Sequence, residues 1–153
     1  MGLIKLSRTR AGDLDHEILN LLLVLVDSFK DRFQAAVEGV GLTLPQGHLL
    51  MSLDEPTPMS ELARNMGFDA SHITSIVDKL EDRRLVERRP DVNDRRVKRI
   101  VLTAAGQKAR DQIEDQLLAT MAPLDALDAD QRRQLRDLLA AATMQVAAGA
   151  TTS

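Results

Sequence analysis

The fold of this chain is decided by residues 58–106, which read PMSELARNMGFDASHITSIVDKLEDRRLVERRPDVNDRRVKRIVLTAAG. The stretch begins with two short helical patterns separated by a turn, Pro58–Met66 and Ala70–Arg83. Two runs typical of β-strands follow, Leu85–Arg89 and Val97–Leu102, on either side of an arginine-rich loop. This order of helix, turn, helix and β-hairpin predicts a winged helix-turn-helix in a mainly α (α+β) fold.

Local signals mark the ends of the two short helices. Thr57 is the expected cap of the first helix, Pro58 its expected first residue and Gly67 its expected stop. Asp69 is the expected cap of the second helix. The second helix has one apolar stripe, formed by Ile73, Ile76, Val77 and Leu80. Its opposite face is polar and carries Ser71, His72, Thr74, Ser75, Asp78 and Lys79.

Positive charge is concentrated in the predicted hairpin. Residues 83–99 contain eight basic and three acidic side chains, a net charge of +5, whereas the whole chain has a net charge of −3. A solvated hairpin with ordinary ion pairs would not need this asymmetry. Concentrated cationic charge is the pattern expected of a surface that neutralises phosphates.

The sequence resembles the multiple antibiotic resistance regulator (MarR) family over roughly residues 14–145. The matching motifs are Asp91-Val92-Asn93-Asp94-Arg95-Arg96, Val101-Leu102-Thr103 with Gly106, Gly41-Leu42-Thr43-Leu44-Pro45-Gln46, Ser60-Glu61-Leu62-Ala63 and Leu80-Glu81. The resemblance implies a dimer whose long helices come from both ends of the chain. It also implies a second short helix in the major groove of DNA and a wing in the minor groove.

The wing residues expected to contact DNA are Asp94, Arg95, Arg96 and Lys98. Asp94 lies two positions before Arg96 in the same tight loop, where it can orient the guanidinium. The resemblance places Arg96 in the minor groove, where a narrow groove attracts arginine. The alternative for Arg96 is a surface ion pair worth under about 1 kcal/mol.

The recognition-helix residues expected to contact DNA are Ser71, His72, Thr74, Ser75 and Lys79. Two positions depart from the family pattern. Ser75 stands where many relatives have arginine or glutamine, and a serine cannot bond guanine in a bidentate manner. Arg84 stands at the helix end where relatives tend to have glycine, and a left-handed arginine there would cost about 1 kcal/mol.

Long helices are expected on both sides of the winged-helix lobe. The first is predicted over residues 14–40, and its apolar positions spread beyond one face, so that a partner chain would have to cover part of it. Two more are predicted over residues 104–122 and 129–147, the first capped by Thr103 and the second by a capping box of Asp128 and Gln131. The chain is therefore predicted to comprise an N-terminal arm and dimerisation helix (1–40), a DNA-binding lobe (41–103) and C-terminal dimerisation helices (104–153).

Composition excludes several classes of protein. The chain has no cysteine, which excludes disulfides, zinc fingers and thiol-based redox sensing. His16, His48 and His72 are scattered, so we expect neither a metal site nor a cofactor, and we expect His48 to be partly buried. There is no nucleophile elbow or phosphate-binding glycine loop, and the protein is not expected to be an enzyme. No signal peptide or membrane span is recognised, and a cytoplasmic location is expected.

The function predicted from these features is that of a homodimeric, sequence-specific transcriptional regulator that binds double-stranded DNA at a pseudo-palindromic operator. A repressor released by a small phenolic or anionic aromatic effector is favoured by the resemblance. The alternatives are a transcriptional activator and a low-specificity architectural DNA-binding protein without a ligand. The effector pocket is not identified by the sequence; a junction of the first helix, the helix starting at Pro45 and the helix starting at Ala104 is the expected location.

Overall fold

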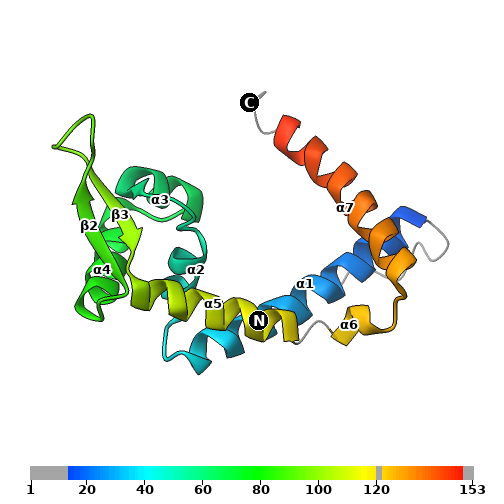
Figure 1. The fold of residues 1–153 in the computed structure, drawn as a ribbon. Helices are drawn as coiled ribbons and strands as arrows, with labels where there is room; N and C mark the ends of the chain where they lie inside the picture. Colours follow the sequence, from blue (N-terminus) through cyan, green and yellow to red (C-terminus); the bar gives the residue numbers. More distant parts are fainter. Residues whose placement is uncertain (1–13, 120–121, 150–153) are drawn as a thin grey trace. The chain divides into compact units, whose positions relative to one another are not determined.

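The computed structural model describes residues 14–119 and 122–149. These residues belong to two compact units, Met1–Leu117 and Leu118–Ser153. The elements are α1 Leu14–Gly39, α2 Leu44–Met51, β1 Thr57–Pro58, α3 Met59–Met66, α4 Ala70–Asp82, β2 Val86–Pro90, β3 Lys98–Leu102, α5 Ala104–Ala119, α6 Ala122–Asp125 and α7 Ala129–Gly149. The predicted winged helix-turn-helix is confirmed: α3, α4 and the β2–β3 hairpin follow one another as the sequence indicated (Figure 1). The predicted division into three parts remains a prediction.

The end of α3 and the start of α4 follow their sequence signals, whereas α3 begins at Met59 and the predicted first residue, Pro58, lies in β1. Gly67 terminates α3 in the left-handed conformation at φ 65°, and Asp69 caps α4 by accepting a hydrogen bond from the backbone N–H of His72 at 2.8 Å. The prediction that Thr57 caps α3 was wrong. Thr57 lies in β1 opposite Ile100, and its hydroxyl donates to the carbonyl of Glu55 at 2.8 Å.

The sheet has three antiparallel strands in the order β1-β3-β2. The hairpin register pairs Arg88 with Ile100 and Pro90 with Lys98, and it leaves residues 91–97 as the wing loop. β1 was not predicted. A strand of two residues is too short to show an alternating pattern, and β1 exists only because β3 offers it a free edge.

One apolar core unites the winged-helix lobe with the ends of two long helices. The four stripe residues of α4 are buried and meet apolar side chains from α1, α2, α3, β2, β3 and α5. Gly106 brings the start of α5 against the start of β2, because a Cβ at this position would lie 1.8 Å from the carbonyl oxygen of Leu85. Thr103 caps α5 as predicted, accepting from the N–H of Gly106 at 3.0 Å. The recognition helix and the strands of the wing therefore pack on the same apolar core.

The first half of α1 contributes little to this core. Its large apolar side chains are exposed in the single chain: Leu14, Ile18, Leu19, Leu21, Leu22, Val24, Leu25, Val26 and Phe29. Only Phe33, Ala36 and Val37 of α1 are buried. The apolar positions of α1 that were predicted to spread beyond one face are therefore exposed in the single chain.

The helices that follow β3 were predicted with small errors at their ends. The capping box of α7 is confirmed, since Asp128 and Gln131 exchange backbone-to-side-chain hydrogen bonds of 2.9 Å in both directions. The helix predicted over residues 104–122 ends at Ala119, and the short α6 was not predicted. Leu138, Leu139 and Met144 on α7 are exposed. The predicted N-terminal arm and the apolar position Met121 lie outside the described residues.

Candidate nucleic-acid interface

The polar face of α4 is presented to solvent by the burial of the opposite face. Its expected DNA-contacting residues are all exposed: Ser71, His72, Thr74, Ser75 and Lys79. They occupy a helix with a well-formed start, because the Asp69 carboxylate accepts from the Ser71 hydroxyl at 2.6 Å as well as from the His72 N–H. The hydrogen bond from Ser71 is the main cause of a lowered pKa at Asp69, and the one from His72 adds to it.

Side-chain contacts on α4 divide these residues into two groups. The Thr74 hydroxyl donates to the carbonyl of Ala70 at 2.8 Å, and the His72 ring stacks on Phe68 with 4.3 Å between ring centroids. Ser71, His72 and Thr74 therefore contact residues at or before the start of the helix. Ser75 and Lys79 lie one and two turns further along it. The short reach of Ser75 limits what the middle of this face can read in a groove.

The wing loop is organised by a residue to which the sequence analysis assigned no structural role. Asp91 is only 8% exposed, and its carboxylate accepts from the backbone N–H groups of Asn93 at 2.7 Å and Asp94 at 3.1 Å. It also accepts from the guanidinium of Arg99, which in turn donates to the carbonyl of Pro56 at 2.8 Å. The Arg99 hydrogen bond is the largest cause of the lowered pKa of Asp91, followed by the two backbone hydrogen bonds.

Asp91 could have been noticed from its position. An Asp followed by a polar turn residue commonly accepts hydrogen bonds from the backbone two and three residues ahead. The partnership with Arg99 could not be read in this way, because it depends on the strand register that sets Arg99 opposite Arg89.

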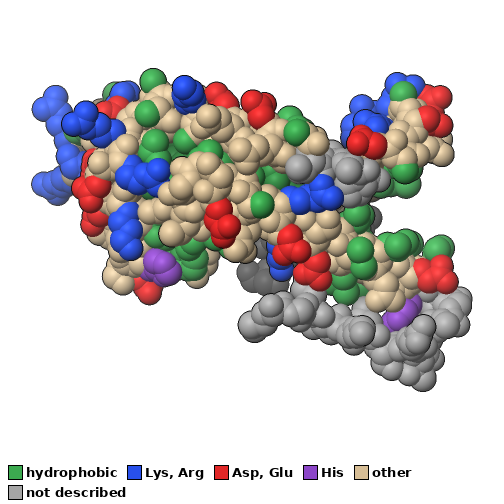
Figure 2. Space-filling view, turned by 90° about the horizontal axis from the view of Figure 1, so that it is seen from below, with side chains coloured by type: hydrophobic (Ala, Val, Ile, Leu, Met, Phe, Trp, Pro, Cys, Tyr) green, Lys and Arg blue, Asp and Glu red, His purple; other side chains and the backbone are tan. Residues whose placement is uncertain are grey.

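The expected interaction of Asp94 with the Arg96 guanidinium was wrong. The Asp94 carboxylate accepts from the backbone N–H of Arg96 at 2.9 Å and so shapes the turn. A carboxylate two residues before a backbone N–H closes such a turn easily, and the Arg96 side chain extends into solvent. Arg95, Arg96 and Lys98 are exposed, and Figure 2 shows Lys and Arg side chains gathered at the end of the winged-helix lobe that carries the hairpin.

The two arginines of β2 have different roles, because successive side chains of a strand point to opposite faces. Arg88 points back to α4 and pairs with Asp78 at 2.5 Å and with Glu81. Arg89 pairs with Glu87 and keeps an exposed side chain. Arg88 thus ties the hairpin to the recognition helix, and Arg89 remains on the solvent side.

The C-terminal end of α4 is held to α1. Arg83 donates from its guanidinium to the carbonyls of Gly41 at 2.6 Å and Val40 at 3.3 Å, just beyond the end of α1. The next residue, Arg84, has a φ of 58°, so the left-handed conformation expected from the family pattern is adopted by an arginine. Its carbonyl accepts from the Thr103 hydroxyl at 2.6 Å. These bonds fix the direction in which the chain leaves the recognition helix.

Two pockets flank α2. One has a volume of 350 Å³ between α1 and α2 and is lined by Asp27, Lys30, Asp31, Phe33, Gln34, Leu44 and His48. The other, of 390 Å³, lies between α2 and α3. His48 lines both pockets. It is exposed, contrary to the expected partial burial, and its ring stacks on the outer side of the buried Phe33 with 4.7 Å between ring centroids. No three His, Asp, Glu or Cys side chains come together as metal ligands within the described parts of the chain.

The DNA-binding lobe matches a known protein family. Residues 42–98, which include α2, α3, α4, β2 and the wing, match the profile of the MarR family. Residues 42–98 are therefore a MarR-family domain. The findings support a DNA-binding transcriptional regulator, and MarR-family proteins are regulators rather than enzymes.

Several solved structures resemble this protein over most of its length. CouR from Rhodococcus jostii RHA1 bound to p-coumaroyl-CoA is 28% identical over 84% of this chain and 93% of its own, with a TM-score of 0.64. A MarR-family transcriptional regulator from Rhodococcus sp. RHA1 is 27% identical over 84% and 95%, with a TM-score of 0.64. A MarR-family protein from Bacillus stearothermophilus has the same fold, with a TM-score of 0.80 at 21% identity over 91% and 99%. Among the described residues, no helix is long and apolar enough to cross a membrane.

Proposed function

We propose that this MarR-family regulator is a homodimeric repressor that occupies a pseudo-palindromic operator and is released by a small molecule. The observation that carries the proposal is one lobe with two exposed DNA-facing features. They are the polar face of α4 and a wing that carries Arg95, Arg96 and Lys98. In this proposal α4 enters the major groove, and Arg96 enters the adjacent minor groove. Operator binding takes place on the genome, and hence in the cytoplasm.

The uncovered apolar surface of α1 supports the homodimer. Contiguous exposed apolar surface of this extent marks an interaction site in soluble proteins. A second copy of the same chain covers such a surface economically, because a twofold axis lets the same patch serve both subunits. Two recognition helices related by that axis would contact half-sites about one helical turn apart, in an operator of roughly 16–20 bp.

The α1–α2 pocket is the proposed location of the effector. It lies at the second half of α1 and at α2, as the sequence analysis expected, although no residue of α5 lines it. Phe33 and His48 offer aromatic faces, and Lys30 offers a charge for an anionic group, whereas Asp27 and Asp31 oppose a highly charged anion. The solved structure of CouR holds p-coumaroyl-CoA, whose acyl part is phenolic. A phenolic compound with at most one negative charge is therefore the proposed effector class.

A titration of purified protein against genomic fragments tests the DNA-binding proposal. A repressor should prefer its operator over unrelated DNA by about 10³-fold or more at physiological salt. A ratio near one would support the architectural alternative instead. Sedimentation at micromolar concentration should show dimers, and monomers that fail to pair even on operator DNA would contradict the dimer.

The direction of regulation and the effector need separate measurements. A reporter gene behind the operator should be expressed more strongly when the regulator is deleted, whereas an activator would give weaker expression. Phenolic acids and related neutral phenols should release the operator by roughly 5–150-fold, the usual range for coupled sites. If none of them shifts operator affinity by more than about twofold, the effector proposal should be dropped and the DNA-binding proposal retained.

A further inference from the structure

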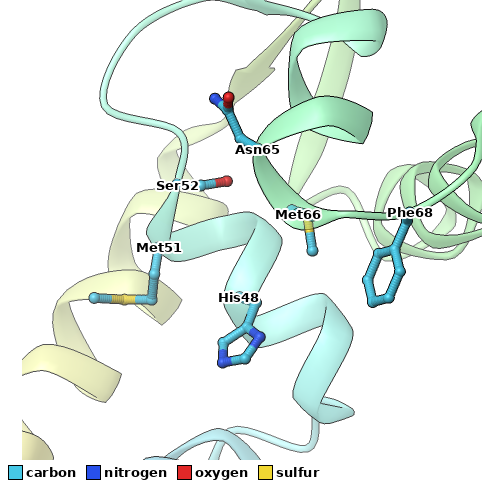
Figure 3. A pocket seen from close by; sticks show the side chains of 6 residues that line it. All are labelled: His48, Met51, Ser52, Asn65, Met66 and Phe68. Carbon is cyan, nitrogen blue, oxygen red and sulfur yellow. The ribbon is translucent and has the colours of Figure 1, made fainter. Parts of the chain in front are cut away.

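The α2–β1 loop, residues 53–56, is held by a long-range contact from α5. The loop follows the C-terminal end of α2, which is marked by Ser52 in Figure 3. Arg110 of α5 donates from its guanidinium to the carbonyl of Leu53 at 2.9 Å and to the carboxylate of Asp54 at 3.1 Å. Because the backbone of an irregular loop has no hydrogen-bond ladder of its own, bonds of this kind determine where the loop lies.

The other end of the α2–β1 loop is held by the wing. Arg99 of β3 donates to the carbonyl of Pro56 at 2.8 Å, and the same guanidinium donates to the buried carboxylate of Asp91. The chain then continues directly into β1, where Thr57 lies opposite Ile100 of β3. The α2–β1 loop therefore joins α5 to the wing through hydrogen bonds at both of its ends and through strand pairing at the second.

Arginine is a costly residue at position 110 if only the stability of the fold is considered. The Arg110 side chain is 18% exposed, and among the residues that the structure describes no group accepts a hydrogen bond from its buried Nε. A buried donor without a partner is unfavourable. Its ion-pair partner Asp54 is 89% exposed, and an ion pair with a solvated carboxylate is weak. The guanidinium is therefore better explained by the loop that it holds in place.

We propose that Arg110 is a positioning residue for DNA binding, which holds the α2–β1 loop against α5 and so sets how Arg96 of the wing approaches the minor groove. The route leads from the loop through β1 and Arg99 to the Asp91 carboxylate, which binds the backbone of the wing loop. The effect on operator affinity rests on the proposed function, whereas the effect on the wing of the free protein does not.

The first test needs no DNA. Arg110→Met should shift the backbone amide signals of Asn93 and Asp94 in NMR spectra of the full chain. Both N–H groups donate to the Asp91 carboxylate, so their signals report the geometry of the wing loop. Lys108→Met removes an exposed cation from the same helix and is the matched control, which should leave both signals in place. Unshifted signals in Arg110→Met would overturn the proposal.

Thermal unfolding and a conservative variant separate positioning from a general loss of structure. Arg110→Met should change the unfolding temperature by less than about 5 °C, because it also removes the unpaired buried Nε. A larger drop would show that Arg110 serves the fold and would contradict the proposed role. Arg110→Lys keeps a charged donor for the Leu53 carbonyl, so it should shift the wing signals less than Arg110→Met does. Equal shifts in the two variants would refute the hydrogen bond as the cause.

The second test uses the operator found by titration of genomic fragments. Arg96→Ala should lower operator affinity by a smaller factor in the Arg110→Met background than in the wild type, by at least about twofold, because coupled residues are not additive. In the Lys108→Met background the factor should equal that of the wild type. An equal factor in Arg110→Met would refute the positioning role. Shifted wing signals in a protein that binds no operator specifically would refute the proposed function alone.

Discussion

Arg96 extends from the wing loop, where Asp94 holds its backbone but not its side chain. Arg96→Ala should therefore leave the fold unchanged and weaken operator binding strongly, by 10-fold or more if the guanidinium contributes about 1.4 kcal/mol. Fluorescence anisotropy with operator DNA measures the loss, and thermal unfolding followed by circular dichroism checks the fold. Wild-type affinity in Arg96→Ala would mean that the wing assignment is wrong.

Arg95 is the neighbouring cation for which a different behaviour is expected. If it contacts phosphate, Arg95→Ala should weaken binding to all sequences alike and reduce the slope of log affinity against log salt by about one. Arg133→Ala, on α7 outside the winged-helix lobe, removes an exposed arginine and is the control. It should change neither the affinity nor the slope.

Asp91 gives the wing a dependence on pH. The pKa of its carboxyl is lowered from the ordinary value of 3.8, first by the hydrogen bond from Arg99. A lowered pKa means that the ionised group stabilises the fold above pH 3.8, and that this contribution is lost as the pH falls through the lower folded value. Asp91→Asn should therefore be less stable than the wild type at neutral pH, and the difference should shrink in acid.

Urea unfolding at a series of pH values measures this difference. A gap between the two proteins that stays constant from neutral to acid pH would contradict the role of the ionised carboxylate. Arg99→Gln provides the matched background, because Asp91→Asn should cost less stability where the guanidinium is already absent.

At the scale of the secondary-structure elements, the chain leaves α4 through Arg84, whose left-handed backbone conformation costs free energy of folding. This residue has a φ of 58° and an exposed side chain. Arg84→Gly should raise the free energy of unfolding by up to about 1 kcal/mol, since glycine adopts this conformation without a clash. Asp82→Gly, at the last residue of α4, should instead lower it by up to about 1 kcal/mol. Equal destabilisation by both substitutions in chemical denaturation would refute the assignment of strain to Arg84.

The junction of β2 with α5 depends on the missing side chain of Gly106. Gly106→Ala would place a methyl group 1.8 Å from the carbonyl oxygen of Leu85, which only a backbone shift can relieve. The expected loss of stability is about 1–3 kcal/mol, measurable by thermal unfolding. Gly39→Ala is the control, because its nearest neighbour is the flexible Gln116 side chain at 3.1 Å. That variant should be neutral or slightly stabilised, and a Gly106→Ala protein as stable as the control would contradict the packing described.

At the scale of the whole molecule, the exposed apolar surface of α1 should decide the oligomeric state. Leu25→Lys places a charge in the middle of this surface and should shift the protein from dimer to monomer, because burying an unpaired charge is costly. Ala35→Lys, on the same helix where α1 is exposed but not rich in large apolar side chains, should remain dimeric. Analytical ultracentrifugation of both variants distinguishes them, and a dimeric Leu25→Lys would place the interface elsewhere.

Most elements of the winged-helix lobe could be predicted because their signals are local. The stripe of Ile73, Ile76, Val77 and Leu80, the Gly67 stop and the Asp69 cap each act within one or two helical turns. The exposed positions of the recognition helix follow from the same periodicity. Errors occurred where a residue had two local options, as at Thr57, whose hydroxyl could cap a helix but whose backbone joins a sheet.

The sequence by itself determined the order of helices and strands, the cationic hairpin and the family resemblance, because helix periodicity, capping and charge density are properties of neighbouring residues. Only the tertiary structure decided that β1 completes the sheet, that Arg99 holds Asp91 and Pro56 together, and that Arg83 links α4 to the end of α1. The partners in each of these contacts are 8 to 43 residues apart, or depend on strand register. The two pockets around α2 likewise form from elements that meet only in the folded chain, and no local pattern can encode their linings.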